Sequence, residues 1–145
     1  MAEKTDEERS FDAHQKERDV LFSNEAFIIG VLQAVSGGLL FAALAQSEAL
    51  LKLAGKLPFL TFLTLMGIGL ISAVLAAYWK HQYKMWDVKA RVSVARGDPL
   101  QTQQTRAGLA GTYRTAMRGA MLVAVLAVVF GLIQLLLFAW VRALR

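Results

Sequence analysis

Cysteine is absent from the 145 residues of this chain, and proline and histidine occur only twice each. Without cysteine there can be no disulfide, no thiolate metal site and no lipid attached through cysteine. His14 and His81 belong to no HExxH motif or carboxylate–histidine cluster, so we expect no metal site. No Walker loop or GxGxxG motif occurs either. The sequence therefore predicts no catalytic residues and no cofactor.

Charged residues are missing from three long stretches, residues 26–47, 57–79 and 119–141. Each stretch has 22 or 23 residues, close to the ~20 residues that cross a ~30 Å hydrocarbon layer as a helix. The helices of a soluble bundle would instead carry charges on one face. With 56% hydrophobic residues and a mean hydropathy of +0.44, the stretches predict an all-α integral membrane protein with three transmembrane helices.

The lack of charge inside these stretches also excludes several kinds of chemistry. Proton-coupled transport usually relies on an ionisable side chain within the membrane, and none is present. Intramembrane proteolysis lacks its paired aspartates, and no histidine lies in the stretches to activate a serine. We therefore expect the protein not to be an enzyme.

The chain divides at the ends of the uncharged stretches. Ser23 is predicted to be the N-cap of the first transmembrane helix. Gly97 suits a helix C-cap, and Asp98, Pro99 and Gln101 suit the N-cap, N1 and N3 positions of the next helix, which places a hairpin tip at 97–99. The predicted parts are a charged cytoplasmic N-terminal helix (1–22), three transmembrane helices (23–47, 57–79 and 119–141), a short external loop (48–56), a basic cytoplasmic helical hairpin that extends the second and third spans (80–118), and an external C-terminus (142–145).

Lysine and arginine counts predict the orientation, because translocation of positive charge is disfavoured. The N-terminal segment and the hairpin lie on one side of the membrane and carry 12 lysines and arginines, whereas the other side carries 4. This predicts a multi-pass protein of the cell inner membrane with a cytoplasmic N-terminus and an external C-terminus. The hairpin has a net charge of +6, and the first 25 residues have a net charge of −4.

Small residues recur at helical spacing in all three spans, which lets helix backbones approach closely in lipid. We predict that these residues pack helices, either within one chain or between chains. They are Gly30, Ala34, Gly38 and Ala42 in the first span, Gly69, Ala73 and Ala77 in the second, and Ala120, Ala124, Ala127 and Gly131 in the third.

Two further groups of residues are candidates for function. The intramembrane polar residues Gln33, Ser36, Gln46 and Gln134 are predicted either to join helices by hydrogen bonds or to line a narrow pore. Where the second and third spans leave the membrane, aromatic and basic residues are predicted to contact anionic lipid headgroups, although topology alone explains many of the same charges. These residues are Trp79, Lys80, Tyr83, Lys84, Trp86, Arg114 and Arg118.

The layout loosely resembles the small three-span subunits of vacuolar transporter chaperone complexes and their bacterial relatives. Asn24-Glu25, before the first span, is similar to the Asn-Glu-Arg-Thr start of that family. Here Ala26-Phe27 stands in place of Arg-Thr, and Val31-Leu32-Gln33-Ala34 replaces the later Trp-x-Arg-Thr. Because the signature arginines are missing, neither the family nor its function is assigned to this chain.

These patterns lead to two hypotheses. The first is a non-enzymatic small membrane subunit that scaffolds or anchors a larger complex through its small-residue helix faces and its basic hairpin. The alternative is a homo-oligomeric pore, similar to a holin or a toxin channel, with a lumen of Gln, Ser and Thr side chains. Expected partners are membrane lipids and other membrane subunits or copies of the same chain. Nucleic acid is not expected, because the basic residues are spread around two helices.

Overall fold

The computed structural model describes the backbone of residues 6–144 and the side chains of residues 15–144. The first five residues of the predicted N-terminal helix and the last residue of the predicted C-terminal segment lie outside the described residues. Between residues 6 and 144 the chain is helical with no strand, so the predicted all-α fold is confirmed. The helices are α1 (Asp6–Ala45), α2 (Ser47–Ala54), α3 (Lys56–Ala95) and α4 (Leu100–Ala143).

Three of these helices are long and apolar enough to cross a membrane. They are α1 from Gln15 onward, α3 and α4. At 1.5 Å per residue, a helix of 40 residues, as in α3, is about 60 Å long, roughly twice the hydrocarbon thickness. Each long helix therefore has a membrane-spanning part and a part that extends out of the bilayer. The prediction of three transmembrane helices is confirmed.

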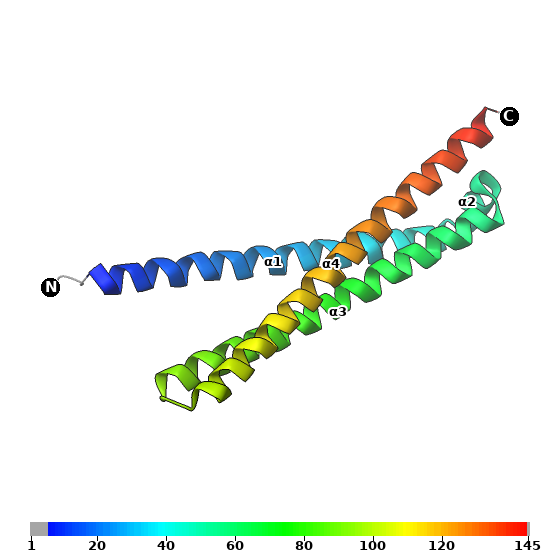
Figure 1. Ribbon diagram of the computed structural model, residues 1–145. Helices are drawn as coiled ribbons and strands as arrows, with labels where there is room; N and C mark the ends of the chain where they lie inside the picture. The colour runs from blue at the N-terminus through cyan, green and yellow to red at the C-terminus, as the bar shows by residue number, and fades with distance from the viewer. Residues whose placement is uncertain (1–5, 145) are drawn as a thin grey trace.

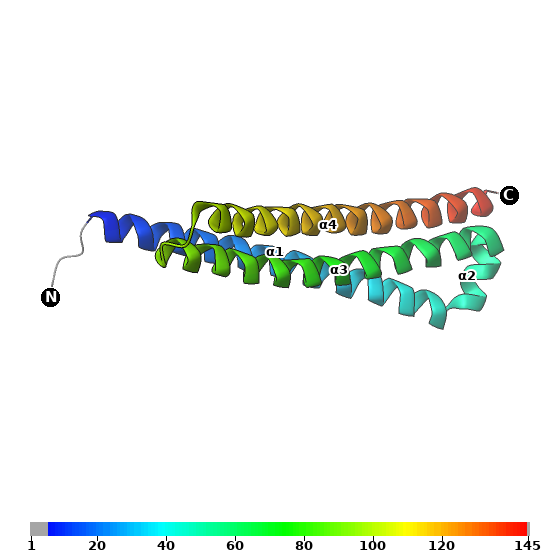
Figure 2. The same ribbon diagram turned by 60° about the horizontal axis from the view of Figure 1, so that its bottom comes forward.

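Successive long helices, α1, α3 and α4, run in alternating directions along the molecule (Figure 1). The N-terminus lies at the same end as the α3–α4 hairpin, and the C-terminus lies at the opposite end, beside α2 (Figures 1 and 2). The pair α3 and α4 makes the most extensive contact, and α1 packs mainly on α3. The N-terminal half of α1 diverges from the α3–α4 hairpin, and these two parts form the arms of a V (Figure 1).

Helix α1 is continuous through the predicted boundary at Ser23. It runs without interruption from Asp6 to Ala45, so Ser23 lies in the helix interior and the prediction that it is an N-cap is wrong. The reason is that no glycine or proline occurs between residue 6 and Gly30 to end a first helix. The charged segment and the first transmembrane helix therefore form one rod.

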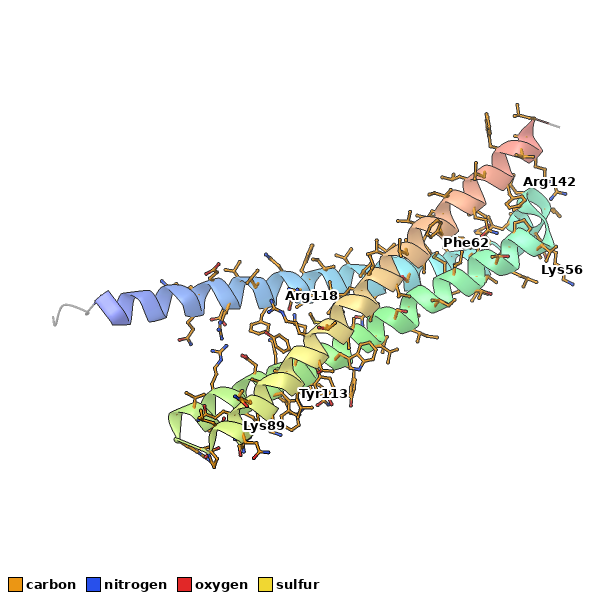
Figure 3. All side chains as sticks on the ribbon, in the orientation of Figure 1. Lys56, Phe62, Lys89, Tyr113, Arg118 and Arg142 are labelled. Carbon is orange, nitrogen blue, oxygen red and sulfur yellow. The ribbon has the colours of Figure 1, made fainter. Side chains whose placement is uncertain are left out.

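The connection predicted as a loop at 48–56 is largely helical. Helix α2 occupies Ser47–Ala54, and Gly55 follows it with a φ of 89°. The Gly55 N–H donates to the carbonyl of Leu51 at 3.0 Å, which ends α2. A side chain at Gly55 would meet the Arg142 guanidinium, 3.4 Å from the position of its Cβ. Figure 3 shows Arg142 at this end of the molecule, on the last turn of α4.

The hairpin tip follows the prediction for Gly97 but not for Asp98. Gly97 has a φ of 70° and donates to the carbonyl of Val94 at 3.1 Å, while Asp98 N–H donates to Ser93 at 3.0 Å, the two bonds of a Schellman motif. Helix α4 begins at Leu100 with Pro99 as its N-cap, so the assignment of Asp98 as N-cap is wrong. The Asp98 carboxylate instead accepts a hydrogen bond from Arg106 at 3.0 Å, because that guanidinium reaches back over the turn.

The interior consists of three small clusters along the helix axes. The layer nearest α2 contains the large side chains of Phe59, Phe62 and Met66, and Figure 3 shows Phe62 between α3 and α4. The middle layer contains Leu32, Ala73 and Ala124. Small residues in the middle let the backbones approach closely, which is how membrane helices gain packing energy when lipid replaces water. The layer toward the hairpin contains Ile29, Ala76, Met117 and Ala120.

Candidate functional site

The small-residue track of the first span faces away from the rest of the molecule. Gly30, Ala34, Gly38 and Ala42 are all exposed, and a Cβ added at Gly30 or Gly38 would meet nothing within 4 Å. The opposite face of α1 makes the contacts within the chain. Its buried residues are Ile29, Leu32, Ser36 and Ala43.

The small residues of the other two spans lie inside the three-helix unit. Gly69 and Ala73 of α3 are buried, and Ala77 is half-buried. A Cβ at Gly69 would lie 3.0 Å from the Ser36 hydroxyl of α1 and 3.6 Å from the Ala124 carbonyl of α4, so the three helices meet at this glycine. On α4 the residues of the track are all buried: Ala120, Ala124, Ala127 and Gly131.

The intramembrane polar residues do not line one common surface. Ser36 is completely buried, and its hydroxyl has no hydrogen-bond partner among the described residues. Gln33 and Gln134 are half-buried on different helices, whereas Gln46 is exposed in the turn between α1 and α2. A single chain therefore does not assemble these side chains into a polar lumen.

At the hairpin end, several cations lie over aromatic rings. The Lys84 ammonium is 5.1 Å from the centre of the Phe22 ring on α1, and the Arg114 guanidinium is 5.8 Å from that of Tyr83. Lys89 lies 4.4 Å from the Trp86 ring on its own helix. Figure 3 shows Lys89 on the lower arm and Arg118 higher on α4, near the level of α1. Trp79, Tyr83 and Trp86 are half-buried, whereas Lys84 and Arg118 are exposed.

Lys80, which was predicted to contact lipid headgroups, instead contacts α1 within the chain. Its side chain is buried, with 8% exposed, and the ammonium donates to the backbone carbonyl of Phe22 on α1 at 2.5 Å. Burial lowers the pKa of Lys80, the charge of Lys84 lowers it further, and Glu25 opposes both. Lys80 therefore fastens α1 to α3 just before the two arms diverge.

Lys80→Met is expected to release the N-terminal arm of α1 from the hairpin. The methionine keeps an apolar stem but removes a charged hydrogen bond worth about 1.5–3 kcal/mol. Spin labels on cysteines introduced at Val20 and Val88, both 59% exposed, would report the distance between the arms. We expect a broader and longer distance distribution for the variant. Lys89→Met is the control, because its ring partner lies on its own helix; identical distributions for both variants would contradict this role.

Sequence reasoning missed the contribution of α1 to the hairpin end. A cavity of about 370 Å³ lies between the diverging arms, and its walls include Arg18, Phe22 and Glu25 of α1 together with Tyr83 and Arg114 of the hairpin. The two groups are separated by more than fifty residues, so no local spacing signals their proximity. The one sequence feature that indicates this proximity is charge, because the N-terminal segment is negatively charged and the hairpin is positively charged.

Among the residues that the structure describes, no group of three or more His, Asp or Glu side chains could hold a metal ion. Comparison with protein-family models, curated proteins and solved structures gives no match for this chain. The structural features that bear on function are the outward face of α1, the basic hairpin and the cavity between the arms.

Proposed function

We propose that this protein is a non-enzymatic membrane subunit that scaffolds or anchors a larger membrane complex. The observation that carries the proposal is the outward face of α1, defined by Gly30, Ala34, Gly38 and Ala42, which the chain leaves exposed while its own helices pack on the opposite face. Small residues in a membrane helix allow close backbone approach by another helix. The outward face of α1 suits a helix of another subunit.

The basic hairpin is the second element of this proposal. In the orientation favoured by its eight lysines and arginines, the hairpin and the N-terminus lie on the cytoplasmic side of the inner membrane and the C-terminus lies outside. Basic residues near the membrane attract anionic headgroups by up to about 1 kcal/mol each. The hairpin would hold the subunit against the membrane surface and present its exposed side chains to cytoplasmic partners.

The placement of the polar residues favours this function over a pore. A homo-oligomeric channel would need Gln33, Ser36 and Gln134 on surfaces that face a shared lumen. Ser36 is instead enclosed by the three helices of one chain, and the two glutamines are half-buried on separate helices.

Gly38→Leu is expected to detach the protein from its assembly without unfolding it. A Cβ added at Gly38 meets nothing within 4 Å, so the position is open within the chain, but a leucine there would hold a neighbouring helix away from the outward face of α1. Native gel electrophoresis of gently extracted membranes measures the size of the assembly. The matched control is Gly67→Leu, an equally open position on α3. An unchanged assembly size for Gly38→Leu would contradict the proposal, and a ring of this chain alone would favour the pore.

A further inference from the structure

The cavity between α1 and the hairpin has a defined depth relative to the membrane. Phe22 and Arg18 lie four and eight residues before the uncharged stretch of α1, and Tyr83 lies four residues after that of α3. At 1.5 Å per residue these positions are about 6–12 Å beyond the hydrocarbon boundary. The polar headgroup layer adds roughly 5–8 Å on each side of the bilayer. The cavity therefore extends from the headgroup layer, at Phe22 and Tyr83, to the aqueous edge of that layer, at Arg18.

The cavity offers two guanidinium groups for an anion, one from each of the helices α1 and α4. Arg114 takes part in neither of the ion pairs found at the hairpin between described residues, and its Nε is buried without an acceptor. The Tyr83 ring lies against this guanidinium at 5.8 Å and limits its movement. Arg18 of α1 lines the same cavity. Arginine presents paired N–H groups that match the oxygens of a phosphate.

The same cavity also carries groups that suit a cation. Of the three carboxylates on its walls, Asp87 accepts a hydrogen bond from Arg91 at 2.7 Å and Glu17 also has a partner. Glu25 is half-buried, and the nearby Lys80 ammonium is directed to the Phe22 carbonyl. The rings of Phe22 and Tyr83, 5.5 Å apart, line the cavity and already carry the cations Lys84 and Arg114, so the carboxylate of Glu25 is the group left for a ligand ammonium.

We propose that this cavity binds one phosphate ester carrying a primary ammonium, with the phosphate on Arg114 and Arg18 and the ammonium on Glu25. This chemistry belongs to the headgroup of an aminophospholipid such as phosphatidylethanolamine and also to free phosphoethanolamine. The volume of about 370 Å³ lies in the range of small-molecule sites, ~300–1,000 Å³. The inference goes beyond the proposed scaffold function and needs only the membrane insertion of the chain, so its failure would leave the assembly experiment on Gly38 unaffected.

Native mass spectrometry of the full-length protein in detergent, titrated with single lipids, tests this site. We expect one phosphatidylethanolamine to bind at least about tenfold more tightly than phosphatidylglycerol, which has no ammonium, or phosphatidylcholine, whose ammonium has no N–H to donate. Arg114→Gln should weaken binding of every phospholipid at this site by about tenfold or more. Glu25→Gln should remove the preference for the ethanolamine lipid while phosphatidylglycerol binding persists. Arg118→Gln removes the same charge from an exposed residue one turn along α4 and outside the cavity, so it should weaken binding far less than Arg114→Gln and leave the preference for phosphatidylethanolamine unchanged.

Two results of these titrations would contradict the proposed site. Equal binding of the three lipids by the unmodified protein, or equal effects of Arg114→Gln and Arg118→Gln, would overturn the site. Competition with free phosphoethanolamine at the concentration of the lipid distinguishes the two sources, since displacement indicates a soluble ligand and its absence indicates the lipid. If Arg114→Gln fails to fold, Glu25→Gln still tests the site, because it should remove the preference for phosphatidylethanolamine while the protein continues to bind phosphatidylglycerol.

Discussion

Gly69→Leu is expected to lower the free energy of unfolding of the three-helix unit by about 1–3 kcal/mol, the usual cost of adding atoms to a packed interior. The first added carbon would already lie 3.0 Å from the Ser36 oxygen and 3.6 Å from both the Ala124 carbonyl oxygen and the Ala127 Cβ. The Ala124 oxygen and the Ala127 Cβ cannot be moved by any side-chain rotation, and only the Ser36 hydroxyl can turn about χ1. The helices themselves would have to move apart.

Gly67 on the same helix provides the matched control. A Cβ added there meets nothing within 4 Å, and both positions lie in the membrane-spanning part of α3. Leucine raises helix propensity over glycine by about 0.8–1 kcal/mol at either position, so the difference between the two variants isolates the crowding at the helix crossing. Thermal unfolding in one detergent, followed by circular dichroism, measures this difference. Equal unfolding temperatures would show that the three helices do not meet at Gly69.

A double-mutant cycle would assign the crowding to one contact. Gly69→Ala places a methyl group against the Ser36 hydroxyl, and Ser36→Ala removes that oxygen together with a buried polar atom that has no described partner. Residues in direct contact show coupling energies of about 0.5–3 kcal/mol. We expect the double variant to be more stable than the sum of the two single changes predicts.

The three membrane spans and the break at Gly97 were predictable because they depend on local chemistry. In lipid, the backbone N–H and C=O groups of an uncharged run of 22–23 residues must form hydrogen bonds within their own helix. Gly97 has the positive φ that ends α3. The prediction for Ser23 was wrong because an N-cap begins a helix only where the preceding residues are not helical, and residues 6–22 are helical.

The phase of each helix was not predictable from one sequence. Gly30 and Gly38 have the same spacing of small residues as the tracks in α3 and α4, yet they point outward while Ile29 and Leu32 point inward. A small-residue track identifies a surface that another helix can approach, but it does not specify which helix. The cavity at Arg114 was missed for the same reason, since its other wall comes from a distant part of the chain.

Cysteines introduced at Glu48 and Gln101 are expected to report opposite sides of the membrane. Both residues are exposed, Glu48 on α2 and Gln101 beside the hairpin tip. Since the natural chain has no cysteine, each variant carries a single reactive thiol. A membrane-impermeant maleimide applied to intact cells should label the cysteine at residue 48 fully and that at residue 101 only after permeabilisation.

The physical reason for this all-or-none contrast is the charge of the two connections. The hairpin contains eight lysines and arginines and the α2 connection contains two, and positive charges are retained on the cytoplasmic side. Each positive charge moved outward against a potential of 100 mV costs about 2.3 kcal/mol. The acidic residues of the N-terminal segment contribute little, because carboxylates have a weak effect on orientation.

The reverse labelling pattern would place the hairpin, the N-terminus and the cavity outside the cell. That result would remove the cytoplasmic anchoring role while leaving the helix packing at Gly69 intact, since packing does not depend on orientation. Labelling of both cysteines in intact cells would instead mean that the chain inserts in both directions. In that case the positive charges of the hairpin would be insufficient to fix its side, and a partner on the outward face of α1 would be needed to select one orientation.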